Sequence, residues 1–133
     1  MIDNTGLHKD HYTGALSELK AQQFYLSEGC QVYVPVVQQG WVDFVVDKDG
    51  LKKVQVKTAT WVKSGKYSYL QCRTRLTHKY KDTQPKDRYD ILLIIFEDRV
   101  WEIPAEEIDS SNLSLDTTNY NSNAGYRWTK YEH

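Results

Sequence analysis

The sequence predicts an α/β fold, and three features of the chain predict it. Residues 14–28 carry apolar side chains at the spacing of a helix with one face toward a core. Residues 31–37 and 41–59 contain apolar or alternating runs of strand length. Residues 89–96 form the most apolar run, which is typical of a strand covered on both faces.

Length and composition favour one domain. We expect it to span residues 1–133, with a core at about 13–109 and a C-terminal extension over 110–133. Cys30 and Cys72 have neither the spacing of a metal site nor that of a disulfide framework, and no charged and apolar leader precedes them. These features predict a reducing, cytoplasmic location. No apolar run approaches the roughly 20 residues of a membrane-spanning helix, so no membrane partner is expected.

The first helix is expected over residues 14–28. The hydroxyl of Thr13 can cap its first turn, and Gly29 can end it, because glycine tolerates the left-handed backbone of a C-terminal cap. Glu18 lies on the flank of the apolar stripe, between core and solvent. The stripe that we expect to face the core consists of Ala15, Leu19, Gln22 and Leu26, with Leu16 and Gln23 beside it.

Three strands are expected to follow. Residues 31–37 form the first, at a sheet edge or with a bulge, because Pro35 has no amide proton. Residues 41–46 and 51–59 form the next two, joined by a tight turn, and the second of these could continue to Val62.

The turn between the last two strands decides which side chains share a face. A three-residue loop over 48–50, with Gly50 in the left-handed conformation, would place Asp43 opposite Gln55. Lys57 would share their face, because side chains two residues apart on a strand point the same way. A four-residue loop would turn Asp43 to the other face. The functional interpretation requires the first register.

The remaining elements are predicted less sharply. Residues 67–75 alternate weakly and could form a strand, whereas the polar residues 76–88 are expected to form a loop. The apolar strand 89–96 should pair with 99–103 as a hairpin, and a short acidic helix follows. Residues 110–125 show no strong pattern. The aromatic residues of the tail, expected to dock on the domain, are Tyr126, Trp128 and Tyr131.

Asp43, Gln55 and Lys57 form the candidate catalytic group. Magnesium prefers oxygen ligands, and Asp43, the Gln55 side-chain oxygen and the backbone carbonyl of Val56 could supply them. Lys57 would orient or deprotonate an attacking water, or stabilise charge developing on a phosphate. Glu18 could complete the site with a second carboxylate or through a metal-bound water. Together these are the parts of a metal-assisted phosphodiester hydrolase.

A second interpretation gives these residues no chemical role. Gln55 and Lys57 would then lie on a solvated strand face, and Asp43 would form an ion pair near the turn. The position of Asp43 argues for a site, because it interrupts an apolar strand between Val42 and Phe44. An ionised carboxylate there needs a cation or hydrogen bonds.

Positive charge is concentrated in residues 61–88, which hold eight basic side chains against two aspartates in a chain of net charge −1. Lysine and arginine contacts to phosphates supply most sequence-independent DNA affinity, and arginine can also read guanine edges. The same segment could be no more than a solvated loop. The residues nominated for DNA contact are Lys63, Lys66, Arg73, Arg75, Lys79 and Lys81, with Arg73 and Arg75 expected to point the same way.

Four segments carry a resemblance to a known family: Gly14-x-x-x-Glu18, the strand over 29–35, Val42-Asp43-Phe44, and the run Val54-Gln55-Val56-Lys57-Thr58-Ala59. They resemble the PD-(D/E)xK nuclease superfamily, and within it the branch of bacterial and phage group I intron homing endonucleases. The resemblance is strong over residues 14–60. It implies a restriction-endonuclease-like core, in which a mixed sheet is flanked by helices.

The resemblance also implies roles for single residues. Asp43, Gln55 and Lys57 would bind the metal and activate water, and Glu18 would be the family's helical glutamate. Glutamine at position 55 replaces the acid that most members carry, which should weaken metal binding and make Glu18 more important. Val42 stands where the motif has its proline.

The function implied by the resemblance is hydrolysis of DNA phosphodiester bonds with Mg²⁺, for which Mn²⁺ can substitute, by a site-specific homing endonuclease. Members of that branch assemble as tetramers, and one site cuts one strand, so we expect a homo-oligomer, at least a symmetric dimer, bound to double-stranded DNA. Two alternatives stay open. One is another nuclease of the same fold, such as a junction resolvase or a restriction enzyme. The other is a non-catalytic DNA-binding module.

Overall fold

The computed structural model of the chain describes residues 9–38, 40–75, 83–119 and 126–133. Its strands form a five-stranded sheet in the order β1-β2-β3-β6-β7 and a three-stranded sheet in the order β4-β5-β8. No helix within these ranges is long and apolar enough to cross a bilayer. The elements are α1 (Lys9–Ser27), β1 (Gln31–Tyr33), β2 (Phe44–Asp47), β3 (Leu51–Thr58), β4 (Thr60–Ser64), β5 (Tyr67–Arg73), α2 (Pro85–Arg88), β6 (Ile91–Phe96), β7 (Arg99–Pro104), η2 (Ala105–Glu107), β8 (Asn112–Thr117) and α3 (Tyr126–Thr129).

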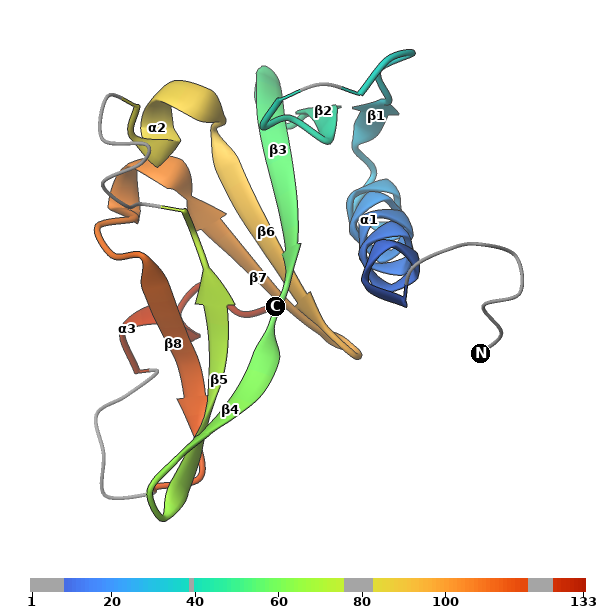
Figure 1. Cartoon of the computed structure of the whole chain (residues 1–133). Coiled ribbons are helices and arrows are strands. Elements are labelled where there is room, and N and C mark those ends of the chain that lie inside the picture. The colour runs from blue at the N-terminus through green and yellow to red at the C-terminus, as the bar shows by residue number, and fades with distance from the viewer. Residues whose placement is uncertain (1–8, 39, 76–82, 120–125) are drawn as a thin grey trace.

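Helix α1 covers one face of the five-stranded sheet, and the three-stranded sheet lies toward the other face (Figure 1). Strand β6 pairs parallel with β3 and antiparallel with β7, so the sheet is mixed, as expected. Alternate residues of β6 enter two separate cores. Leu93 and Ile95 pack in the cluster that contains α1, and Leu92 and Ile94 pack in the cluster that contains β5 and β8. The prediction of a central strand covered on both faces is confirmed.

The predicted buried face of α1 is wrong. Ser17, Ala21 and Tyr25 are buried, whereas Leu19 and Leu26 are 61% and 60% exposed. Polar contacts fix this orientation, because the Ser17 and Thr58 hydroxyls lie 2.6 Å apart and the Tyr25 hydroxyl donates to Glu102 (2.7 Å). The spacing of hydrophobic residues along the sequence does not indicate such polar contacts.

The ends of α1 follow the predictions only in part. The helix begins at Lys9, and Thr13 lies inside it, where its hydroxyl donates to the Lys9 carbonyl (3.1 Å). Thr13 is therefore not the N-terminal cap. Gly29 has a positive φ of 83° directly after the helix, and its role as the C-terminal cap is confirmed.

Two predicted strands end early. β1 stops at Tyr33, and Val36 is fully exposed, so the valines of 31–37 do not share a buried face. β1 lies at a sheet edge, as the sequence predicts. β3 ends at Thr58, after which the amide of buried Ala59 donates to the Ile95 carbonyl (2.9 Å) and the chain enters β4 in the other sheet.

Residues beyond 109 contribute a strand that the sequence pattern does not predict. β8 pairs with β5, and Leu113 and Leu115 are buried in the same cluster as Trp101. Two leucines among serine, asparagine and threonine are too few to predict a strand from the sequence. The segment forms a strand because it pairs with β5. The tail docks as expected, with Trp128 only 5% exposed and Tyr131 packed against the cluster. The side chain of Tyr126 lies outside the described part.

Candidate active site

The β2–β3 hairpin closes with the three-residue loop that the functional interpretation requires. Asp47 pairs with Leu51 and Phe44 with Val54, which leaves residues 48–50 as the loop. Gly50 has a φ of 109° and Asp49 a φ of 54°. Two residues of the loop therefore have a positive φ, whereas the sequence predicted this only for Gly50. The predicted register is confirmed.

This register brings Asp43 against β3. The Gln55 amide nitrogen Nε2 donates to Asp43 Oδ2 at 3.0 Å, and the backbone amide of Val56 donates to the same oxygen at 2.7 Å. The Asp43 amide donates to the Val54 carbonyl at 2.8 Å, so the residue is held by both backbone and side chain. The carboxylate has a fixed position at the edge of the hairpin.

A second carboxylate approaches the first from α1. Burial and, to a smaller extent, the nearby Glu18 carboxylate raise the pKa of Asp43 to about 6, although the hydrogen bond from the Val56 amide lowers it. The positive charge of Lys57 lowers it. Glu18, Asp43 and Lys57 therefore lie within electrostatic reach of one another. Two neighbouring acids in a partly buried site are unfavourable together unless a proton or a cation accompanies them.

Gln38 contacts both acidic residues, and no sequence pattern marks it as part of a site. Its Nε2 donates to Glu18 Oε1 at 3.1 Å and to the Asp43 backbone carbonyl at 3.2 Å. Gln38 lies in the connection between β1 and β2, where a single polar residue is indistinguishable from any other coil residue. The contact with Glu18 requires the tertiary placement of α1.

The side-chain oxygen of Gln55 suits a metal ion. Gln55 Oε1 is buried and has no hydrogen-bond partner among the described residues, while the Nε2 of the same amide is used by Asp43. A buried acceptor without a partner is costly unless something else satisfies it. No group of three or more His, Cys, Asp or Glu side chains within the described ranges could hold a metal ion by itself. Gln55 Nε2 faces both Asp43 Oδ2 (3.0 Å) and the Val56 carbonyl (3.4 Å), so an oxygen site formed by Asp43, Gln55 and Val56 would require the Gln55 amide to turn over.

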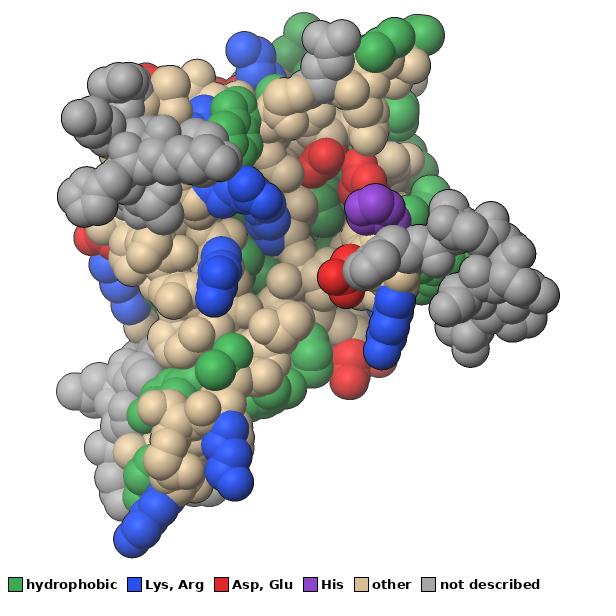
Figure 2. Space-filling model, in the orientation of Figure 1, with side chains coloured by type: hydrophobic (Ala, Val, Ile, Leu, Met, Phe, Trp, Pro, Cys, Tyr) green, Lys and Arg blue, Asp and Glu red, His purple; other side chains and the backbone are tan. Residues whose placement is uncertain are grey.

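Lys57 lies on β3 directly after this group and is half-buried. It lines a groove of about 850 Å³ between the end of β3 and the three-stranded sheet, together with Arg73 and Arg75. Figure 2 shows Lys and Arg side chains over β3 and β5 on this face, and Asp and Glu side chains gathered beside α1. The carboxylates and the cationic groove thus meet at Lys57.

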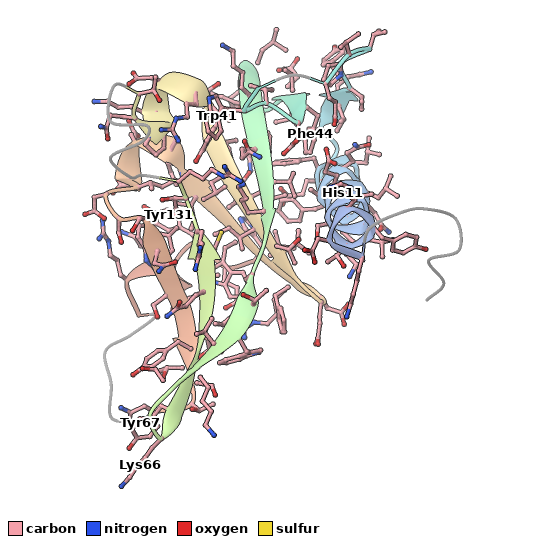
Figure 3. The ribbon with its side chains drawn as sticks, viewed as in Figure 1. His11, Trp41, Phe44, Lys66, Tyr67 and Tyr131 are labelled. Atoms are coloured by element: carbon pink, nitrogen blue, oxygen red, sulfur yellow. The ribbon has the colours of Figure 1, made fainter. Side chains whose placement is uncertain are left out.

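The nominated DNA-contact residues divide into three sets. Arg73 and Arg75 both line the groove, although β5 ends at Arg73. Lys63 and Lys66 belong to the exposed β4–β5 hairpin, and Figure 3 shows Lys66 at its far tip, away from the site. Lys79 and Lys81 lie outside the described residues. Sequence reasoning missed the uncharged polar residues of the groove, among them Thr60, Gln71 and Asn112.

Comparison with known proteins decides the family. Residues 8–129 match the family described as PD-(D/E)XK endonuclease. The chain belongs to the PD-(D/E)XK endonuclease family. The resemblance inferred from the four sequence segments is thereby confirmed at the level of the superfamily.

Two further comparisons extend over most of the chain. Protein 5.3 of Escherichia phage T7 is 34% identical over 105 residues, covering 77% of this chain and 86% of the relative. The structure of the bacterial homing endonuclease I-Ssp6803I superposes with a TM-score of 0.72 at 21% identity, covering 95% of this chain and 88% of the other. The fold is therefore that of a PD-(D/E)XK nuclease, as predicted.

Proposed function

We propose that this protein is a magnesium-dependent DNA endonuclease. The observation that carries the proposal is the Asp43 carboxylate, held by the Gln55 side chain and the Val56 amide close to Glu18 and Lys57, with Lys57 lining a cationic groove. The family membership supports phosphodiester hydrolysis, and PD-(D/E)XK nucleases generally use divalent metals. The site would be built from four side chains: Glu18, Asp43, Gln55 and Lys57.

The proposed metal-binding groups are Asp43, Gln55 through Oε1 once its amide has turned over, and Val56 through its carbonyl. A divalent ion bound by these groups would stabilise negative charge on the phosphate and lower the pKa of a coordinated water. Asp43 binds a proton up to a pH of about 6 and must lose it before it can act as a ligand. Lys57 then orients or deprotonates the attacking water, or stabilises charge on the phosphate. Glu18 adds the charge that glutamine at position 55 does not supply.

Double-stranded DNA is the proposed substrate, with site-specific cleavage as in a homing endonuclease. Support for DNA comes from Arg73 and Arg75 in the groove that contains Lys57. Support for the homing type comes from the likeness of the fold to a bacterial homing endonuclease. A cytoplasmic location stays a prediction.

The deciding experiment is incubation of plasmid and genomic DNA with the purified protein in Mg²⁺, in Mn²⁺ and in EDTA. Discrete fragments with either metal and none in EDTA are the expected result. Faster cleavage of four-way junctions than of linear duplex would favour a resolvase. The protein would instead be a non-catalytic DNA-binding module if it binds DNA in a salt-dependent way but cleaves none of many targets. In that case calorimetry should also detect no binding of either metal.

Gln38→Ala should weaken metal binding without removing a ligand. The substitution deletes the amide that holds Glu18 at 3.1 Å, and loss of such a supporting contact typically weakens metal affinity by about tenfold. The measurement is the Mg²⁺ concentration for half-maximal cleavage, with maximal rate little changed. Gln31→Ala, an exposed glutamine on β1, is the control. An unchanged Mg²⁺ dependence would show that Gln38 does not position Glu18.

We propose further that the protein assembles with copies of itself through α1. Leu16, Leu19, Gln23 and Leu26 follow the 3-4-3 spacing of a coiled-coil seam, and the three leucines are 45%, 61% and 60% exposed. This face lies opposite the buried Ser17, Ala21 and Tyr25, so pairing would leave the site intact. The aromatic tail offers little surface for such an interface, because Trp128 is buried in its own domain.

Leu19→Glu is expected to convert the oligomer to a monomer at micromolar concentration, because it places a charge in the middle of the seam. Light scattering after gel filtration measures the mass. Leu51→Glu is the matched control, since Leu51 is 67% exposed on the β2–β3 hairpin. A monomeric wild-type protein would contradict the proposal.

A further inference from the structure

The three-stranded sheet has one buried face and one face turned to the groove. On β5, Leu70 and Cys72 are buried, whereas Gln71 is half-buried and Arg73 is exposed. On β8, the buried residues are the leucines, and Asn112 is exposed. Because strand side chains alternate, Gln71 and Arg73 point together toward the groove that they line.

Strand pairing gathers the polar side chains of this face. Gln71 pairs with Thr60 of β4 on one side and with Ser114 of β8 on the other, and Arg73 pairs with Asn112. Directly paired residues have Cβ atoms about 5 Å apart. A register shift in the β5–β8 pairing falls between Leu70 and Gln71, and such irregularities re-aim side chains. Thr60, Gln71, Arg73 and Asn112 therefore form one polar row, which lies in the same groove as Lys57.

The two central members of the polar row are available to a ligand. The structure gives no hydrogen bond from the Gln71 amide or the Arg73 guanidinium to any described residue. Gln71 is uncharged, so it contributes nothing to the release of counterions that drives phosphate binding. Its amide offers a donor and an acceptor side by side, which matches the donor and acceptor pair on the major-groove edge of adenine.

We propose that the polar row reads base edges in the DNA major groove, with Gln71 specifying an adenine and Arg73 a guanine. Glutamine pairs with adenine N6 and N7, and arginine with guanine O6 and N7, each through two hydrogen bonds. Strands of a sheet can enter the major groove. Side chains two residues apart on a strand are separated by about 6.8 Å, which matches two base-pair rises of about 3.4 Å. The two contacts therefore address bases about two steps apart, beside the phosphate that faces Lys57.

This inference rests on the proposed DNA substrate, and its test separates the two. A randomised duplex library is selected twice with the full-length protein, once for binding in EDTA and once for cleavage in Mg²⁺, and the recovered sequences are compared. The wild-type protein should enrich a motif containing an adenine and a guanine. Gln71→Ala should lower the preference for the adenine by on the order of tenfold to a hundredfold and leave the guanine preference in place. Arg73→Ala should do the reverse and weaken overall binding.

Two control variants distinguish base recognition from nonspecific electrostatic attraction to DNA. Gln31→Ala should leave the motif unchanged. Lys63→Ala should weaken binding uniformly across sequences and reduce the salt dependence by about one counterion.

The outcomes distinguish the inference from the function. The proposed base recognition is wrong if the protein cleaves DNA without base preference, or if Gln71→Ala enriches the wild-type motif. The proposed nuclease activity is unaffected by either result. If a sequence motif is enriched by binding in EDTA but no cleavage occurs in Mg²⁺ or Mn²⁺, the proposed nuclease activity is wrong and the proposed base recognition stands. Absence of DNA binding overturns both.

Discussion

Lys57→Met is expected to lower Mg²⁺-dependent cleavage by about a thousandfold while the protein stays folded and binds DNA. The positive charge of Lys57 acts on the Asp43 carboxyl, where it opposes the rise in pKa caused by burial. Methionine preserves the length of the side chain and removes the charge and the proton-carrying group. Single-turnover cleavage of a defined duplex measures the chemical step, and filter binding in EDTA measures DNA affinity.

Lys53→Met is the matched control for this substitution. Lys53 lies on the same strand, is exposed, and its backbone amide is held by Asp90 at 2.8 Å. The control should cleave at nearly the wild-type rate. Wild-type single-turnover rates in Lys57→Met would remove Lys57 from the chemistry. A loss of DNA binding that matches the loss of cleavage would make it a phosphate contact instead.

Asp43→Asn is expected to abolish cleavage and, in the absence of metal, to stabilise the fold above pH 6. The pKa of Asp43 is raised from 3.8 to about 6 in the folded protein. Its stabilising contribution is therefore complete below the unfolded pKa and is lost as the pH rises through about 6. Asparagine keeps an oxygen that can accept the Val56 amide proton and carries no charge, so it avoids that loss.

Thermal unfolding at pH 4, 6 and 8, with and without Mg²⁺, measures both effects. Without metal, the advantage of Asp43→Asn should be largest at pH 8 and disappear near pH 4. Mg²⁺ should raise the melting temperature of the wild-type protein at pH 8 and much less at pH 4, because the proton competes with the metal for Asp43. Asp47→Asn, an exposed aspartate on β2, should show neither effect. Equal Mg²⁺ stabilisation of wild type and Asp43→Asn would exclude Asp43 as a ligand.

The sequence by itself predicted the centre of the candidate site, and the structure selected the register that it requires. A glycine at position 50 favours a three-residue loop, and that loop fixes the facing of every residue in the hairpin. Asp43, Gln55 and Lys57 were therefore predictable as one group, because the interactions that set their register are local. The central, doubly covered strand was predictable for a similar reason, since its apolar run leaves no solvated face.

The tertiary structure decided which partners reach that centre. The buried face of α1 depends on Tyr25 meeting Glu102 and Ser17 meeting Thr58, contacts between residues 77 and 41 positions apart. That placement brings Glu18 and Gln38 to Asp43 and leaves the leucines exposed. The polar row likewise includes Asn112 only because β8 pairs with β5. Such contacts join distant parts of the chain, and no local spacing in the sequence encodes them.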